Sequence, residues 1–219
     1  MRTNTLQIIQ DYSPESPREW CNIGTIMYTS NRYTLGDEYA SDLNHWLQEK
    51  LVESGYEDRA MKQAEEAGTE YQSPDELTMQ ELQKEFDDYY FHRAVYAYIH
   101  SGTALSLSPF SCPWDSGQSG IIYVKKDYAE SEGITQEQVF ENFKAEIDTF
   151  NQYLNGDVYG FKVVDTDGEE VDSCGGFYGS DYKTNGMACH IDMDTIKKVV
   201  MMEDRQVSMS VEGEVLDEF

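Results

Sequence analysis

The sequence predicts an α+β fold, in which three to four amphipathic helices pack on one face of a mainly antiparallel sheet. Two observations lead to this prediction. Apolar residues recur at helical spacing in long segments that begin with capping residues, whereas short strand-like segments cluster closely between them. Close clustering favours tight turns over the long crossovers that parallel strands need. The length of 219 residues fits a single domain, 1–219.

The predicted strands are short segments with Val, Ile, Thr and Tyr in alternating or continuous runs. The segments 158–164 and 170–177 form a hairpin, because Asp165-Thr166-Asp167-Gly168 between them is typical of a turn. The same turn hints at a calcium loop, but the twelve-residue spacing with a terminal Glu is missing. The other strands are expected at 6–9, 23–28, 94–99, 103–108, 120–125 and 207–212.

Three longer helices are predicted, each with an apolar stripe. The first fits residues 36–53, the second begins at the capping box of Ser73, Pro74 and Glu76, and the third occupies 135–154 with Thr135 as its cap. The inner faces are expected to hold Ala40, Leu43, Trp46, Leu47 and Leu51; Met79, Leu82, Phe86 and Tyr89; and Val139, Phe143, Ile147, Phe150 and Leu154.

Two further segments complete the helical prediction. Asp194 is interpreted as the cap of a short helix that carries Ile196, Val199 and Val200. Residues 54–72 contain many Glu and Ala and two Gly, so we interpret them as either a mobile loop or a helical excursion.

The charge of the chain is concentrated in particular segments. The sequence has 42 Asp and Glu against 16 Lys and Arg, a net charge of −26. Residues 37–90 hold 16 acidic and 4 basic side chains, whereas residues 91–126 hold 1 acidic and 3 basic ones. Aromatic residues make up 13% of the chain, which argues against a disordered acidic segment. The sequence therefore predicts a folded protein with strongly negative surfaces.

Acidic residues recur on the outer faces of two predicted helices. They are Glu81, Glu85 and Asp88 on the second helix, and Glu137, Glu141 and Asp148 on the third. Like charges at i,i+4, such as Glu81 with Glu85 and Glu137 with Glu141, cost stability. A destabilising pattern that occurs on two helices suggests a use for the negative field, although plain solubility is the alternative interpretation.

The segment around Cys112 is the other unusual feature. A thiol nucleophile needs a base, and Cys112 with Asp115 and His100 is one candidate set. A rigid turn that packs Trp114 is the alternative. The four cysteines have no CxxC spacing, so we expect buried thiols in a reducing compartment; zinc held with His190 or His100 is not supported by the spacing.

Several blocks of the sequence resemble a family of acidic proteins encoded by phages and other mobile elements, a family without an established activity. The blocks are DYSPESPREW followed by NIGT near the start, the segment from Tyr98 to Gly102, PFSCPWDSGQSG at 109–120, and CGGFYG at 174–179. The family pattern has Asp after the Trp of the first block, where this chain has Cys21. The resemblance implies a viral or plasmid context, in which small acidic proteins oppose host defences.

Three functional hypotheses follow. The first is an inhibitor that imitates DNA and occupies the basic nucleic-acid-binding groove of a host defence protein, of the anti-restriction or anti-CRISPR type, through Glu81, Glu85, Asp88, Glu137, Glu141 and Asp148. The second is a small hydrolase or nucleotide-acting enzyme that uses Cys112, Asp115 and His100. The third is a phage assembly or interaction protein whose acidity is incidental.

The same features restrict the partners and the setting. The negative charge disfavours direct binding to nucleic acid. No apolar run reaches the ~20 residues that span a membrane, so we expect a cytoplasmic protein of the host cell without a membrane partner. We also expect no cofactor and no metal ion, and the oligomeric state stays open.

Overall fold

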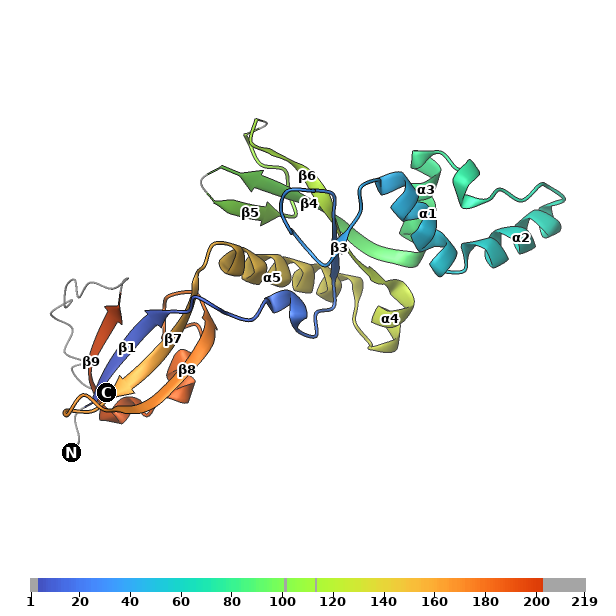
Figure 1. Ribbon diagram of the computed structural model, residues 1–219. Coiled ribbons are helices and arrows are strands. Elements are labelled where there is room, and N and C mark those ends of the chain that lie inside the picture. The colour runs from blue at the N-terminus through green and yellow to red at the C-terminus, as the bar shows by residue number, and fades with distance from the viewer. Residues whose placement is uncertain (1–3, 101, 113, 203–219) are drawn as a thin grey trace. The chain divides into compact units, whose positions relative to one another are not determined.

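The computed structural model describes residues 4–100, 102–112 and 114–202 (Figure 1). Helices account for 37% and strands for 30% of the structure, with two mostly antiparallel sheets, so the predicted α+β class is confirmed. Where the sequence predicts one domain, the contacts divide the chain into two compact units. Unit 1 comprises residues 1–19 and 149–219, and unit 2 comprises residues 20–148.

Unit 2 contains a five-stranded sheet in the order β3-β2-β6-β4-β5 (Figure 1). All neighbours are antiparallel except β2 and β3, which are parallel. The predicted strands are present, and two of them start earlier than expected. β6 starts at Ser116, which pairs with Tyr98 and extends the ladder into the Gly- and Ser-rich segment, and β4 starts at Tyr90, which pairs with Lys125. The strands are β2 (Thr25–Tyr28), β3 (Glu38–Tyr39), β4 (Tyr90–Ile99), β5 (Thr103–Ser106) and β6 (Ser116–Lys125).

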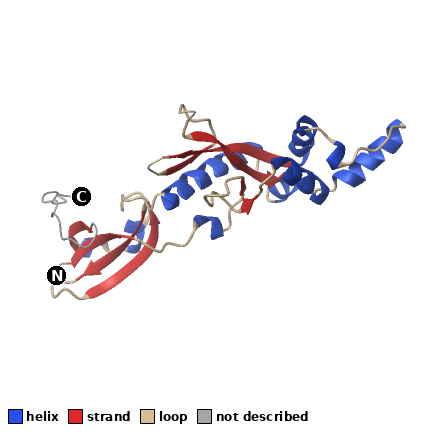
Figure 2. Ribbon diagram, turned by 45° about the horizontal axis from the view of Figure 1, so that its top comes forward, coloured by secondary structure: helices blue, strands red, loops and turns tan. Residues whose placement is uncertain are grey.

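Helices cover both faces of this sheet, which corrects the prediction of a single covered face (Figures 1 and 2). Successive strand residues point to opposite faces. Tyr123 of β6 packs with Trp46 of α1, whereas the preceding residue, Ile122, lies beside Phe143 of α5. Among the described residues, the helices are α1 (Leu43–Glu53), α2 (Tyr56–Ala67), α3 (Met79–Tyr89), α4 (Lys126–Ser131) and α5 (Gln136–Leu154).

The first two helices begin later than the sequence predicts. Residues 38–39 pair with β2, and the Asp42 side chain accepts the backbone N–H groups of Asn44 and His45, so α1 starts at Leu43 instead of residue 36. The capping box of Ser73 and Glu76 closes only the 3-10 turn η2 (Pro74–Glu76). A second capping box then starts α3. In both cases the sequence offers two possible starts close together, and the structure uses the later one.

The core between α1, α3 and the sheet is aromatic. Phe86 stacks on Tyr90 with ring centroids 4.3 Å apart, and Trp46 contacts both Phe86 and Tyr123. The predicted inner residue Met79 is 37% exposed, so this part of the prediction is wrong. Residues 56–67 form the helix α2, which is the helical form of the excursion considered for 54–72.

The third long helix agrees with its prediction. Thr135 and Gln138 form a reciprocal capping pair, in which the Thr135 Oγ1 accepts the Gln138 N–H and the Gln138 Oε1 accepts the Thr135 N–H. The inner face buries Val139, Phe143, Ile147 and Phe150. Residues of α5 up to Asp148 belong to unit 2 and the remainder to unit 1.

Unit 1 is built on a four-stranded sheet in the order β8-β7-β1-β9, in which only β1 and β9 are parallel. Its core holds Leu6, Ile8, Phe161, Val163, Phe177, Met187, Ile191 and Ile196. The elements are β1 (Asn4–Gln10), η1 (Pro17–Glu19), β7 (Val158–Val164), β8 (Glu170–Tyr178), η3 (Met187–His190), η4 (Met193–Thr195) and β9 (Ile196–Met202).

The predicted helix after Asp194 is wrong. Only the 3-10 turn η4 forms there, and residues 196–202 become β9, which pairs with β1. An uninterrupted apolar run does not distinguish a helix from a strand, and β-branched Ile and Val favour the strand once the edge of β1 is available. The predicted strand 207–212 lies outside the described residues.

The β7–β8 hairpin confirms the interpretation of its turn. Asp165 Oδ1 accepts the N–H groups of Asp167 and Glu169, and Gly168 has a φ of 85°. This carboxylate therefore stabilises the turn. None of the helices in the described part of the chain is long and apolar enough to cross a membrane.

Candidate partner-binding surface of unit 2

The three acidic residues predicted on α3 all have neighbours within the protein. Glu81 accepts hydrogen bonds from the side chain and the backbone N–H of Thr78, and these two bonds lower the pKa of its carboxyl group. Arg59 of α2 forms ion pairs with Glu85 and with Asp88, the latter at 3.0 Å. These carboxylates thus start α3 and hold α2 beside it, and Glu85 and Asp88 are partly neutralised by one guanidinium.

The acidic residues predicted on α5 differ from one another. Glu137 and Glu141 are exposed and form no ion pair with any residue that the structure describes. Asp148 pairs with Lys144 at 2.9 Å, and the hydrogen bond raises the pKa of Lys144. An exposed pair of this kind contributes little to stability. Glu137 and Glu141 are the predicted acids whose charge is most available to a partner.

The two predicted rows of acids lie on opposite sides of the sheet. On the α3 side, Phe86 contacts His92 of β4 at 5.2 Å between ring centroids. On the α5 side, Phe140 contacts Phe91, the neighbouring residue of the same strand, at 6.3 Å. Since adjacent strand residues face opposite ways, α3 and α5 do not share a surface. The six acids form two separate surfaces in unit 2.

Two consecutive lysines where β6 meets α4 bind the ends of other helices. Lys125 Nζ donates to the carbonyl oxygen of Glu53 at 3.4 Å, and Lys126 Nζ donates to the carbonyl oxygen of Asp87. Both oxygens lie in the last turn of a helix, where carbonyl groups lack helical partners and the dipole attracts cations. These positive charges therefore stabilise α1 and α3.

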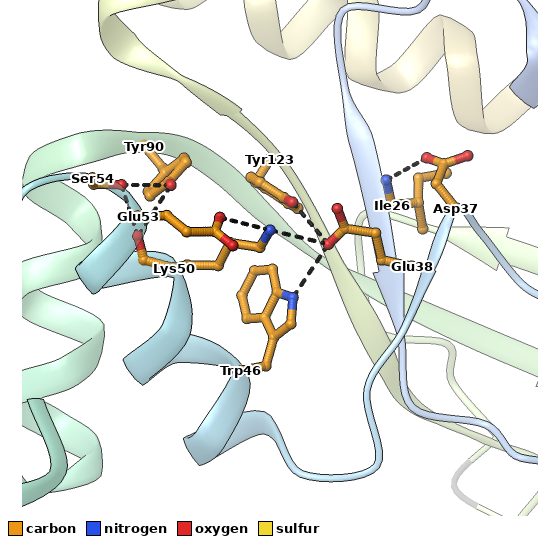
Figure 3. A network of polar contacts seen from close by, with 9 residues as sticks. All are labelled: Ile26, Asp37, Glu38, Trp46, Lys50, Glu53, Ser54, Tyr90 and Tyr123. Carbon is orange, nitrogen blue, oxygen red and sulfur yellow. Dashed lines mark hydrogen bonds and ion pairs between the residues drawn. The ribbon is translucent and has the colours of Figure 1, made fainter.

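Other bases of unit 2 are also used internally. The guanidinium of Arg93 lies 3.4 Å from the centroid of the Phe140 ring, and Lys50 lies between Glu38 and Glu53 at 3.6 Å and 3.1 Å (Figure 3). Burial lowers the pKa of Lys50, but the hydrogen bond to Glu53 and the charges of both carboxylates raise it above its ordinary value. Lys50 stays charged and neutralises carboxylates near the core.

Glu38 is the centre of this polar network. Its Oε2 accepts hydrogen bonds from Trp46 Nε1 at 3.3 Å and from the Tyr123 hydroxyl at 3.0 Å, and Figure 3 shows that these side chains converge from β3, α1 and β6. Burial, reinforced by the Glu38 charge, raises the pKa of Tyr123 far above its ordinary value. Nearby, Ser54 shares a 2.6 Å hydrogen bond with the Tyr90 hydroxyl. Because each group already has a partner inside the protein, this network is structural.

Two more acids of unit 2 bind backbone N–H groups and were not identified from the sequence. Asp37 Oδ2 accepts the Ile26 N–H at 2.7 Å, and Glu146 Oε1 accepts the N–H groups of Ile23 and Gly24 at 2.9 and 3.0 Å. These hydrogen bonds join residues that are far apart in the sequence, so no local pattern predicts them.

Exposed acids after α1 were missed for a different reason. Asp58, Glu65, Glu66 and Glu70 are exposed on α2 and the segment that follows, and none forms an ion pair within the described chain. The sequence did contain a signal for the helix that carries these acids. Gly68 ends α2 in the left-handed conformation that a glycine commonly adopts after a helix. Together with Glu137 and Glu141, these acids make up what we call the free carboxylates.

The alternative catalytic set is only partly assembled. Cys112 Sγ lies 3.8 Å from Asp115 Oδ2, and the His100 ring contacts Tyr98 at 6.4 Å. The described residues show no hydrogen bond between His100 and Cys112. The partner of the sulfur is thus a carboxylate and not the imidazole base that thiol activation requires.

The cysteines contradict the prediction of buried thiols. Cys21, Cys174 and Cys189 are exposed, and Cys112 is half-buried. The spacing of cysteines in the sequence does not reveal whether their side chains are exposed. The prediction relied on the tendency of a free cysteine to behave as a small buried hydrophobic residue, which does not hold for these positions. Within the described ranges, no group of three or more His, Cys, Asp and Glu side chains is arranged to hold a metal ion.

The blocks that carry the family resemblance meet in pairs. In unit 1, Asp11 Oδ2 accepts the Gly176 N–H at 3.2 Å, and the Tyr178 hydroxyl donates to the Glu15 carbonyl at 2.8 Å. In unit 2, the rings of Tyr98 and Phe110 are 5.8 Å apart. Comparison with protein-family models, curated proteins and solved structures gave no match to this chain.

Proposed function

We propose that this chain is an acidic binding protein that inhibits a host defence nuclease or nucleic-acid-binding complex by imitating DNA. One observation carries the proposal: in unit 2 the bases are largely used inside the protein, while the free carboxylates stay exposed. Residues 20–148 contain 24 acidic and 9 basic side chains. The surplus of negative charge is therefore displayed to partners.

Fixed geometry supports the proposal as well. The free carboxylates Glu137 and Glu141 lie on a helix with a capped start and a buried inner face, which holds the charges in place without a partner. Arg59 fastens α2 to α3 in the same way. A rigid display lowers the entropic cost of binding, and complementary charge accelerates association with a basic groove.

The charge density shows that one helix is not sufficient. Residues 137 to 148 span about 16 Å of the α5 axis and carry the acids Glu137, Glu141, Glu146 and Asp148, of which Glu146 binds backbone N–H groups. Duplex DNA carries about 10 phosphates over that length. A nucleic-acid groove would therefore have to contact several acidic segments. The free carboxylates of α2 and of α5 are candidates for separate contacts, since α2 is joined to α3, and α3 covers the face of the sheet opposite to α5.

The test is competition with DNA. A fluorescently labelled duplex is bound to purified restriction endonucleases and CRISPR effector nucleases, and the protein is added at 50 mM salt while fluorescence polarisation is measured. We expect displacement of the duplex from at least one nuclease. The variant Glu65→Gln/Glu66→Gln/Glu137→Gln/Glu141→Gln should displace it at least about tenfold less effectively, because four contributions of a few tenths of a kcal/mol add up to the 1.4 kcal/mol of one decade.

A matched control uses an acid that already has a partner. Asp148→Asn removes the same kind of charge as Glu141→Gln and from the same helix, but from a residue that Lys144 neutralises. We expect a smaller effect than for Glu141→Gln. Equal displacement by the wild type and by the variant of the free carboxylates would refute DNA mimicry by these residues.

A further inference from the structure

The most exposed large apolar side chain in the described part of the protein is Trp114. It is 92% exposed in the connection between β5 and β6, whereas Trp20 is 46% and Trp46 is 5% exposed. Single exposed apolar residues are common, but Trp is the residue most enriched in the binding hot spots of interfaces. An almost fully exposed Trp is therefore a candidate anchor.

Residues Cys112, Asp115 and Ser116, which lie close to Trp114 in the sequence, are held by hydrogen bonds. The Ile99 N–H donates to the Asp115 carbonyl at 3.0 Å, and the Ser116 Oγ donates to the Cys112 carbonyl. On the other side of the connection, Phe110 packs against Tyr98. These contacts hold the segments that flank Trp114 in the free protein, so binding through its ring costs little additional ordering.

The surroundings of Trp114 also suit an apolar contact. Residues 91–126 contain one acidic residue, Asp115, in a chain with a net charge of −26. The strand β6 separates Trp114 from Lys125, the base that contacts the end of α1, by about 30 Å of extended chain. The connection between β5 and β6, which we call the tip, can therefore lose its water without burial of the carboxylates near α1 and α3, at the other end of β6.

Charge decides which class of molecule can cover the tip. A bilayer with anionic lipids, a nucleic acid and a second copy of this chain are all negative, and each would be repelled by the −26 charge of the protein. A protein with a positive surface is attracted. We propose that Trp114 inserts into an apolar pocket of the same protein partner whose basic groove faces the free carboxylates. This inference rests on the proposed function and adds a contact that charge alone does not supply.

The two contacts differ in their response to salt. Attraction between exposed charges is screened, with a Debye length of about 10 Å at 0.1 M salt. Burial of an indole ring does not depend on screening. Removal of Trp114 should thus weaken binding by the same factor at low and high salt, whereas removal of free carboxylates should weaken it mainly at low salt.

The experiment measures dissociation constants by biolayer interferometry at 50 and 300 mM NaCl. The probes are the same purified restriction endonucleases and CRISPR effector nucleases. The proteins are the wild type, Trp114→Ala, Trp114→Phe, and Tyr128→Ala as the control, since Tyr128 is an aromatic residue that is 50% exposed on α4. The folding of each variant is checked by its urea midpoint.

We expect Trp114→Ala to weaken binding at least about 30-fold at both salt concentrations, which is the size of a hot spot. Trp114→Phe should retain part of the affinity, and Tyr128→Ala should retain all of it. Wild-type affinity for Trp114→Ala, with salt-dependent binding intact, overturns this inference and leaves the proposed function standing. If no nuclease binds the wild type at 50 mM NaCl, both are rejected. Trp114-dependent flotation with phosphatidylcholine vesicles, or a Trp114-dependent dimer, also overturns the inference.

Discussion

Glu146 allows the structural carboxylates to be separated from those available to a partner. Its Oε1 accepts two backbone N–H groups, from Ile23 and Gly24, and so ties α5 to the start of β2. A hydrogen bond to a charged group contributes about 1.5–3 kcal/mol, and the site is half-buried. We therefore expect Glu146→Ala to lower the free energy of unfolding of unit 2 by about 2–4 kcal/mol. Glu146→Gln keeps an acceptor oxygen and should cost about 1 kcal/mol.

The matched control is Glu141→Ala on the same helix. Glu141 is exposed, and its replacement measures the helix propensity of Ala without the loss of a contact. We expect this variant to be as stable as the wild type or a few tenths of a kcal/mol more stable.

Tryptophan fluorescence during urea denaturation reports on the correct unit. The three tryptophans of the chain, Trp20, Trp46 and Trp114, all belong to unit 2, and Trp46 is buried in its core. If Glu146→Ala and Glu141→Ala unfold at the same urea concentration, Glu146 does not tie α5 to the sheet and our division of the acids is wrong.

Three further predictions concern the framework. Gly120→Ala should destabilise unit 2 by at least about 2 kcal/mol in the same assay, because the new Cβ would lie 1.9 Å from the Met27 carbonyl oxygen. Gly117→Ala on the same strand meets no atom within 4 Å and should be neutral or stabilising; equal effects would contradict the close approach of β2 and β6. Arg59→Gln should accelerate hydrogen exchange in α2 and leave α5 unchanged, and an unaltered α2 would show that the ion pairs to α3 do not fasten it. Burial, more than any neighbouring charge, raises the pKa of Tyr178 to about 12. The neutral phenol is therefore favoured in the folded state, and its contribution, present below pH ~10, should be lost as the pH rises towards 12. Because Tyr123 contributes in the same direction, far-UV circular dichroism in urea should show a smaller loss in Tyr178→Phe than in the wild type, and equal losses would contradict this assignment.

The sequence was sufficient where the determining contacts are local. Thr135 and Gln138 lie within one turn, and their capping pair starts α5 where it was predicted. The Asp165 turn needs only its own neighbours, and the hairpin was predicted correctly. The start of α3 was missed because two capping boxes occur five residues apart, at Ser73 and Thr78, and local rules do not rank them.

The site depends on contacts that are distant in sequence. Arg59 reaches Glu85 across 26 residues and Asp88 across 29, so the outer face of α3 is less free than helical spacing suggests. The placement of α3 and α5 on opposite faces follows from which residues of β4 and β6 each helix covers. Helical periodicity identifies an outer face but does not show which other segments lie beside it.

The salt dependence of binding tests the central claim most directly. For a nuclease that the protein displaces from DNA, the dissociation constant should rise at least about tenfold between 50 and 200 mM salt, as expected when exposed charges dominate. The variant with Gln at positions 65, 66, 137 and 141 should give a weaker dependence on salt. A dissociation constant that is unchanged by salt, and equal for the wild type and this variant, would contradict DNA mimicry.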